Sequence, residues 1–362
     1  MNVLVAMSGG VDSSVAAALL VEEGHDVTGV HLKLADVPAD RQVPGHGCCT
    51  LDDAQDARRV AQQLGIPFYV WDLQDLFVRE VQDPFASAYA AGCTPNPCIS
   101  CNRNVKYAAL LGRATALGFD AMATGHHVRL RRDGAGRSRL LRAADRAKDQ
   151  TYVLYVATFD QLARSRFPVG ELTKDQVRAA AETRGLRVAS KPESYDLCFV
   201  PDGDTAGYLR ARLPVVPGPV LDLDGTVLGE HEGIWRYTVG QRRGLGLNSH
   251  ERHYVVALDR TRNAVVVGPR EALACPMVDL ATVNWVRGSP PLGPVTAQLR
   301  AHGEPVAAAL TAHDGGYRVT FDEPVEAVAA GQACVLYDGD ECLGGGTIVA
   351  ADRGPAVSAA AR

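Results

Sequence analysis

Residues 8–14 read SGGVDSS and lie between an apolar run, VLVAM at 3–7, and a helix-forming run, SVAAALL at 14–20. Two adjacent glycines let the backbone turn sharply and approach a ligand closely. The helix that follows directs free N–H groups and the positive end of its dipole at the same point. The Gly-Lys-Ser/Thr of a Walker loop and the Gly-x-Gly-x-x-Gly of a dinucleotide-binding turn are both missing. The stretch therefore predicts another kind of phosphate-binding turn between a strand and a helix.

The first half of the chain alternates strand and helix patterns around this turn. Further buried strands are predicted by the apolar runs at 26–34, 67–71 and 120–125. Helical spacing at 14–24 and 53–65 predicts the helices between them, and Gly24 and Gly65 stand where C-caps belong. The alternation predicts an α/β fold with a parallel sheet.

The second half has a different texture, which suggests separate β-rich domains. From about residue 205, Pro and Gly punctuate short alternating stretches typical of β-hairpins and small barrels. A chain of 362 residues also suits two or three domains. We therefore predict an α/β catalytic domain at 1–205, a small central domain at 206–275 and a C-terminal β-barrel domain at 276–362.

The composition predicts a cytoplasmic globular protein. Hydrophobic residues make up 46% of the chain, and the net charge is −5, so the chain as a whole is not a polyanion binder. Neither a targeting segment nor a membrane span is visible, so we expect no membrane partner. Nine cysteines, an odd number, favour a reducing compartment.

One basic run departs from this acidic average. Residues 129–148, RLRRDGAGRSRLLRAADRAK, hold eight Arg or Lys against two Asp. The run predicts either a solvated surface hairpin or a contact with a nucleic-acid backbone.

Three cysteines are candidates for chemistry. Cys98 and Cys101 form a Cys-x-x-Cys pair in TPNPCISCNRN at 94–104, and Cys198 lies far downstream. Such a pair can hold a metal, form a redox disulfide or supply a nucleophile. The pair Cys48 and Cys49 lacks a second ligand pair with metal spacing, so we predict a structural or incidental role. The remaining cysteines are expected to pack in the interior, namely Cys93, Cys275, Cys334 and Cys342.

The SGGVDSS stretch resembles the phosphate loop of the PP-loop ATP pyrophosphatases. The resemblance implies an adenine-nucleotide-hydrolase-like, Rossmann-like domain that cleaves ATP between its α- and β-phosphates, with Mg²⁺ near Asp12. The ATP-binding residues implied are Ala6, Met7, Ser8, Gly9, Gly10, Val11, Asp12, Ser13, Leu32 and Gly125.

Motifs along the whole chain resemble those of the bacterial tRNA-specific 2-thiouridylases. They include TPNPCISCN at 94–102, SYDLCFVPDG at 194–203, GHHVRL at 125–130, KDQTYVL at 148–154 and YTVGQRRGLGL at 237–247. The resemblance implies that ATP adenylates the wobble uridine of tRNA and that sulfur then replaces the activated oxygen, giving 2-thiouridine. It also implies a partner protein that donates persulfide sulfur, and a tRNA-binding central domain.

The same resemblance assigns roles to individual residues. Cys198 would carry the persulfide, and Cys101 would be the nucleophile that resolves it, closing a Cys101–Cys198 disulfide. Asn96, Pro97 and Cys98 would lie at the target base. The tRNA contacts implied are His126, Lys148, Asp149, Gln150 and Gln332.

Cys98 departs from the pattern of the best-known members, which carry an acid/base Asp at this position. A thiol titrates near pH ~8.5 and cannot simply replace a carboxylate. Cys98, Cys101 and Cys198 together also match the ligand set that related RNA thiolation enzymes use for a [4Fe–4S] cluster. The persulfide route and the cluster route both stay open here.

Two further functions use parts of the same sequence. An ATP-dependent carbon–nitrogen ligase would share the phosphate loop but would leave the three thiols without a role. A non-catalytic RNA-binding module would need neither the loop nor a resolving cysteine.

Overall fold

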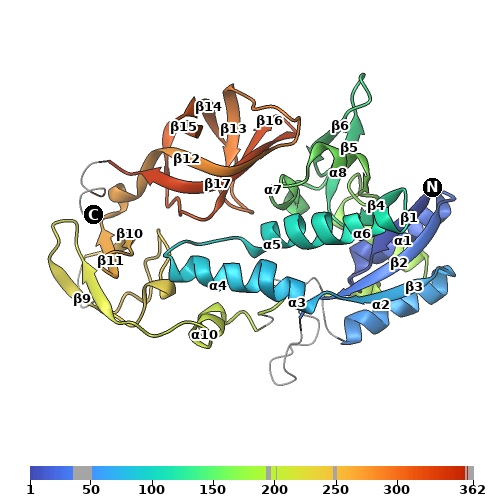
Figure 1. Cartoon of the computed structure of the whole chain (residues 1–362), viewed down its shortest axis with the longest axis horizontal. Helices are drawn as coiled ribbons and strands as arrows, with labels where there is room; N and C mark the ends of the chain where they lie inside the picture. The colour runs from blue at the N-terminus through green and yellow to red at the C-terminus, as the bar shows by residue number, and fades with distance from the viewer. Residues whose placement is uncertain (36–50, 193–196, 201, 248–250, 355–356, 358–362) are drawn as a thin grey trace.

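The described part of the chain is organised by three β-sheets (Figure 1). The computed structural model describes residues 1–35, 51–192, 197–200, 202–247, 251–354 and 357. Cys48 and Cys49 lie outside the described residues. Among the described residues, no helix combines the length and the apolar character needed to cross a bilayer.

The first sheet is parallel, as the alternation of strands and helices predicted. Its order is β3-β2-β1-β4-β7. The strands are β1 (Asn2–Ala6), β2 (Asp26–Lys33), β3 (Phe68–Asp72), β4 (Ala121–Thr124) and β7 (Ser165–Arg166). The chain moves outward from β1 to β3 on one side and from β4 to β7 on the other. The order therefore reverses between β1 and β4, where open α/β sheets bind their ligands.

The prediction that residues 67–71 form a buried strand was wrong in one respect. β3 forms, but Tyr69 is 57% exposed and Val70 is 43% exposed. Among the described residues β3 pairs with β2 alone, so it is an edge strand, and Tyr69 and Val70 face solvent while Phe68 and Trp71 pack partly buried.

Helices α1 (Val11–Glu22), α2 (Leu51–Leu64) and α9 (Lys174–Thr183) pack beside this sheet. The central residues of α1, Val15 to Ala18, are all buried, because small side chains let the helix sit close to the strands. The glycines predicted as C-caps follow α1 and α2 with positive φ, +79° at Gly24 and +68° at Gly65. Both predictions are confirmed.

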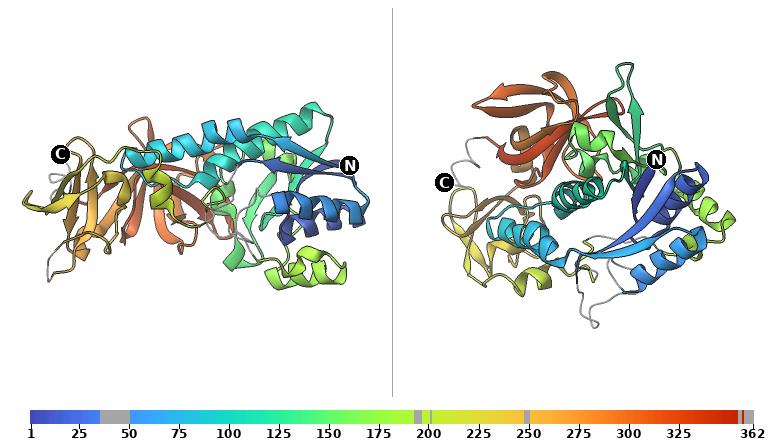
Figure 2. Two further views of the ribbon diagram at one scale, coloured as in Figure 1. Left: turned by 90° about the horizontal axis from the view of Figure 1, so that it is seen from below. Right: turned by 45° about the vertical axis from the view of Figure 1, so that its right-hand side comes forward.

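A pair of long helices leaves the sheet and returns to it (Figures 1 and 2). The outgoing helix consists of α3 (Gln74–Phe77), η2 (Val78–Gln82) and α4 (Asp83–Ala90). The returning helix consists of α5 (Pro97–Ser100), the π-helical stretch η3 (Cys101–Leu111) and α6 (Gly112–Ala116). Edge-to-face contacts of Phe77 and Phe85 with Phe199 anchor the outgoing helix.

The second half of the chain forms two β structures, as its texture predicted. The central sheet has the order β10-β11-β8-β9. Its strands are β8 (Gly218–Leu221), β9 (Val227–His231), β10 (Tyr254–Asp259) and β11 (Ala264–Gly268). In the C-terminal sheet, β12 also pairs with β17, which closes six strands into a barrel. These are β12 (Ala274–Trp285), β13 (Gly293–Gln298), β14 (Val306–His313), β15 (Gly316–Glu326), β16 (Ala333–Asp338) and β17 (Glu341–Asp352).

Short helices complete the chain. They are η4 (Arg146–Lys148), α7 (Thr151–Leu154), α8 (Phe159–Ala163), η5 (Arg187–Ser190), α10 (Thr205–Arg210), η6 (Ile234–Arg236) and η7 (Arg270–Leu273). The fold class predicted from the sequence, an α/β domain followed by a small domain and a β-barrel, is confirmed.

The basic run at 129–148 contains a hairpin, β5 (Val128–Arg132) and β6 (Ser138–Arg142), which joins the barrel sheet through β17. Acidic residues neutralise most of its arginines: Arg129 pairs with Asp340 at 2.6 Å and Arg139 with Glu341 at 3.1 Å. The hairpin therefore ties the first domain to the barrel. A contact with a nucleic-acid backbone stays a prediction.

One ion pair in this region is nearly enclosed. Arg142 lies 3.1 Å from Asp149, and their side chains are 11% and 5% exposed. Thr151 and the backbone N–H of Ala143 also donate to the Asp149 carboxylate, at 2.6 and 2.9 Å. Asp149 is thus committed to holding the hairpin against the first domain.

Replacing Asp149 by Ala should therefore lower the free energy of unfolding by about 3 kcal/mol, because the change leaves the Arg142 guanidinium enclosed without its carboxylate. Urea denaturation measures this value. Glu326→Ala is the matched control, since Glu326 and its partner Arg270 are 47% and 65% exposed, and it should cost at most about 1 kcal/mol. Equal losses in the two variants would contradict a structural role for Asp149.

Candidate functional site

The turn between β1 and α1, residues 8–13, is called the phosphate loop below. Gly9 has φ +83°, and a Cβ atom there would lie 2.3 Å from the carbonyl oxygen of Asp53, so this position requires glycine. The Ser8 N–H donates to Ser13 Oγ at 3.2 Å, and Ser13 Oγ donates to the Gly10 carbonyl at 3.1 Å. Gly10 caps α1 without any side chain, so among the described residues no side-chain cap bonds the first N–H groups of the helix. This arrangement suits an anion.

The Asp12 carboxylate lies between two groups from distant parts of the chain. Lys174 Nζ donates to both of its oxygens at 2.8 Å, and His127 Nε2 lies 3.1 Å from Oδ1. Burial alone would raise the pKa of Asp12, but the hydrogen bonds from His127 and Lys174 outweigh it and hold the pKa below its ordinary value. Asp12 is therefore a carboxylate at neutral pH.

A second lysine, Lys191 after η5, links the phosphate loop to α2. Lys191 Nζ donates to the Gly9 carbonyl at 3.0 Å, and to Asp53 and Asp56 at 2.8 Å each. Burial lowers the pKa of Lys191, but the two carboxylates outweigh it and raise the pKa. The lysine is therefore charged and holds the loop against α2.

A cavity of about 340 Å³ opens at the reversal between β1 and β4. Of the residues predicted to bind ATP, its lining includes Ala6, Met7, Ser8, Gly10, Val11, Asp12, Ser13, Leu32 and Gly125. The apolar side chains Val30, Leu32 and Leu34 also line it, beside the charged groups Asp12, Lys174 and Lys191. The cavity thus offers apolar side chains for a flat base and polar groups for phosphates.

Residues predicted to contact tRNA line the same cavity, namely His126, Lys148 and Gln150. His126 is 9% exposed and lies 3.1 Å from Lys106 Nζ and 2.6 Å from Thr124 Oγ1. Burial and the charge of Lys106 hold the pKa of His126 well below its ordinary value. An ammonium group can only donate, so Nε2 accepts from Lys106 and the proton of the neutral ring lies on Nδ1.

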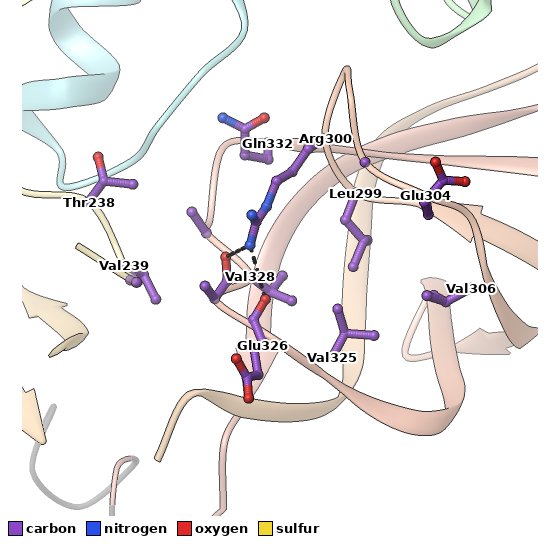
Figure 3. A pocket seen from close by; sticks show the side chains of 14 residues that line it. Thr238, Val239, Leu299, Arg300, Glu304, Val306, Val325, Glu326, Val328 and Gln332 are labelled. Carbon is purple, nitrogen blue, oxygen red and sulfur yellow. Dashed lines mark hydrogen bonds between the residues drawn. The ribbon is translucent and has the colours of Figure 1, made fainter. Parts of the chain in front are cut away.

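Two predicted tRNA contacts lie elsewhere. Asp149 is enclosed with Arg142, as described above. Gln332 borders a different cavity, of about 540 Å³, between the barrel and the central domain (Figure 3). Its side chain donates to the Thr94 carbonyl at 2.8 Å. Both side chains hold parts of this protein together.

Cys98 and Cys101 lie at the start of the returning helix, and Cys198 packs against the same core as Cys101. Asn96 caps α5 by accepting the N–H of Cys98 at 3.0 Å, and Cys98 is exposed. Cys101 begins η3, and both Cys101 and Cys198 pack partly buried against the same apolar core. In the described part of the chain, no three or more His, Cys, Asp or Glu side chains gather closely enough to hold a metal. The three thiols therefore do not form a cluster-binding set there.

The cysteines expected to pack behave largely as predicted. Cys275, Cys334 and Cys342 are fully buried, and Cys93 is half-buried. Burial raises the pKa of Cys342 to about 12, so this thiol is unreactive at neutral pH.

Sequence reasoning missed the lysines of the cavity, Lys106, Lys174 and Lys191. Lys174 carried a usable signal. It follows the N-cap Thr173 as the first residue of α9, where the helix dipole disfavours a cation. A lysine in that place indicates a carboxylate or phosphate partner. Lys106 and Lys191 had no such signal, because folding alone brings them to the cavity.

Comparison with known proteins agrees with this geometry. Three family models match the chain: a tRNA methyl transferase HUP domain over residues 1–202, a tRNA methyl transferase PRC-barrel domain over 206–269, and an aminomethyltransferase β-barrel domain over 277–348. Relatives called tRNA-specific 2-thiouridylase MnmA match over almost their whole length. That of Salinispora tropica is 53% identical over 96% of this chain and 99% of its own. That of Thermobifida fusca is 51% identical over 98% and 97%.

The environment of His126 should be visible in solution. The ring is expected to stay neutral, with its proton on Nδ1, at pH 6, where an ordinary histidine with a pKa of about 6.5 is mostly protonated. In Lys106→Met the pKa of His126 should rise, because the ammonium that opposes ring protonation is gone. Nitrogen-15 NMR of the ring against pH measures both effects. An unchanged His126 titration in the variant would contradict the contact.

Proposed function

The chain belongs to the family of tRNA-specific 2-thiouridylases, and we propose that its cavity and its thiols carry out the two halves of one reaction on a tRNA uridine. The protein is an ATP-using tRNA sulfurtransferase. In the proposed division of labour, residues 1–205 activate the base and transfer sulfur. Residues 206–275 and 276–362 bind and align the tRNA.

The first half-reaction is adenylation. The uracil O2 attacks the α-phosphorus of ATP, an O–P bond forms, and the bond to the bridging oxygen of the β-phosphate breaks to release pyrophosphate. The phosphate loop and Lys174 lie where they can hold the departing pyrophosphate, and Leu32 offers a surface for adenine. Asp12 has the hard oxygen ligand that Mg²⁺ prefers. Mg²⁺ would supply positive charge to the phosphate oxygens there.

The second half-reaction is sulfur transfer. A sulfur-carrier protein loads Cys198 with a terminal sulfur, giving a persulfide. That sulfur attacks uracil C2, and the C2–O bond breaks with release of AMP. The Cys101 thiolate then attacks the inner sulfur of Cys198, which frees the thiocarbonyl and leaves a Cys101–Cys198 disulfide. A cellular reductant must supply two electrons to restore the thiols, which fits a cytoplasmic enzyme.

The observation that carries this proposal is that one helix holds a residue for each half-reaction, Cys101 for sulfur transfer and Lys106 at the cavity proposed for ATP. Stretch η3 begins at Cys101 and places Lys106 in the wall of the nucleotide cavity. The nucleophile and the nucleotide are therefore held on one rigid element. A carbon–nitrogen ligase would have no use for this placement of a thiol.

The persulfide route uses Cys101 and Cys198, which both pack partly buried against the same apolar core. The described residues hold no three-thiol group, so we derive no step through an iron–sulfur cluster. Cys98 is exposed at the start of α5, next to Asn96 and Pro97. These three residues would meet the target base, and His126, Lys148 and Gln150 would meet the tRNA at the cavity.

Two of the matching family models carry names that refer to tRNA methyl transfer. Methyl transfer consumes a methyl donor and needs no site for pyrophosphate. The phosphate loop, with its glycine-only turn and charged surroundings, favours the activity named in the full-length relatives.

Incubation with ATP, unmodified tRNA and a persulfide donor tests the proposal, with pyrophosphate release and 2-thiouridine content as readouts. Asp12→Asn should reduce both by at least about 100-fold, because it removes charge from the phosphate site. Cys198→Ala should still release pyrophosphate but form no 2-thiouridine. Full 2-thiouridine formation by Cys198→Ala would overturn the sulfur-transfer mechanism, and full pyrophosphate release by Asp12→Asn would overturn the phosphate-loop assignment.

The Cys98→Asp variant separates the two sulfur routes. It should keep or raise 2-thiouridine formation, because a carboxylate shuttles protons better than a thiol near neutral pH. Mass spectrometry of digested tRNA gives the product, and iron and sulfide analysis of anaerobically purified protein serves as the control. Loss of activity together with loss of bound iron would contradict the persulfide route.

A further inference from the structure

The segment that leads into the catalytic helix, residues 94–98, is called the base-site loop. All three domains meet at its first residue. The Thr94 N–H donates to the Ala330 carbonyl at 2.8 Å, and Gln332 Nε2 donates to the Thr94 carbonyl at 2.8 Å. The Thr94 hydroxyl donates to Thr238 Oγ1 of the central domain at 3.3 Å. The barrel therefore forms hydrogen bonds with both the N–H and the carbonyl of Thr94.

The barrel turn at Gly331 packs closely against Cys93 and Thr94. Gly331 has φ +90°, and a Cβ atom there would lie 2.9 Å from Cys93 Cβ and 3.0 Å from the Thr94 nitrogen. Only glycine lets the barrel turn approach the base-site loop this closely. The backbone around Gln332 is anchored in turn, because the Ile348 N–H of β17 donates to the Gln332 carbonyl at 2.8 Å.

Both ends of the Gln332 amide have partners. Nε2 donates to Thr94, and Oε1 lies 3.5 Å from the hydroxyl of Tyr152, whose single proton is directed at the nearer Ala333 carbonyl at 2.9 Å. Tyr152 is 1% exposed and belongs to α7 of the first domain. Tyr152 thus fixes the backbone next to Gln332, and the Gln332 amide reaches from there to the base-site loop. Figure 3 shows it at the border of the cavity that Thr238 and Val239 also line.

A shift of Thr94 would pass directly to the catalytic groups. Pro95 and Pro97 restrict the backbone that follows, and Asn96 caps the helix that carries Cys98 and Cys101. Few freely rotating bonds separate the barrel contact from the base-site residues. The position of the barrel therefore sets the position of the base-site loop.

We propose that Gln332 is a positioning residue: it holds the base-site loop, and with it Cys98 and Cys101, in register with the barrel that binds tRNA. The inference rests on the proposed function and deepens it. Through Gln332, tRNA docking on the barrel is linked to the geometry of the sulfur-transfer site. The family resemblance implied a direct tRNA contact for this residue, which is a different role.

The test compares three variants in the full-length protein. Gln332→Met keeps the volume without the amide, and Gln332→Glu keeps the shape but cannot donate to the Thr94 carbonyl. Lys148→Met is the matched contrast, since Lys148 lines the nucleotide cavity as a proposed tRNA contact. Single-turnover formation of 2-thiouridine at saturating tRNA gives the rate, and a filter-binding assay gives Kd for tRNA.

Both Gln332 variants should lower the rate by roughly 10- to 100-fold, as misplaced reacting groups do, and leave Kd for tRNA within about two-fold of wild type. Lys148→Met should instead raise Kd. Without tRNA, iodoacetamide should alkylate Cys98 and Cys101 faster in the Gln332 variants, because the base-site loop is released.

A raised Kd with an unchanged rate in the Gln332 variants would make Gln332 a tRNA contact and overturn the proposal. Unchanged rates and unchanged alkylation would also overturn it. If the wild-type protein formed no 2-thiouridine, the proposed function would fail, whereas alkylation of the thiols would still report on the positioning role.

Discussion

Three segments of the first domain meet at one carboxylate, that of Asp12. Asp12, in the first turn of α1, accepts hydrogen bonds from Lys174 at the start of α9 and from His127 after β4. A partly enclosed charge is costly unless oppositely charged or polar groups surround it. The need to satisfy Asp12 therefore brings two segments, each more than 100 residues away in sequence, to the first turn of α1. The cavity forms around the point where they meet.

Two elements connect this cavity to the barrel: the returning helix and the hairpin of β5 and β6. The returning helix lines the cavity with Lys106 and begins near the barrel with Asn96, so it spans the distance between the cavity and the base-site loop. The basic hairpin closes a second connection, since β6 pairs with β17 and Arg129 with Asp340. These links hold the cavity and the base-site loop in fixed positions relative to the barrel.

Local sequence was enough to identify the phosphate loop, the parallel sheet and the caps of α1 and α2. Each depends on residues close together in the chain, such as the paired glycines at 9 and 10 or the glycines that end helices. The error at β3 has the same origin. An apolar run shows that a strand forms, but whether it lies at an edge depends on the other strands.

The sequence by itself determined the fold class, the glycine turn between β1 and α1 and the set of candidate thiols, because glycine geometry, hydrophobic periodicity and residue type are local properties. Only the tertiary structure decided that Lys106, Lys174 and Lys191 surround the nucleotide cavity, and that Asp149 and Gln332 are held by partners within the protein. These placements join residues far apart in the chain, and the partner of a long side chain depends on which elements pack together.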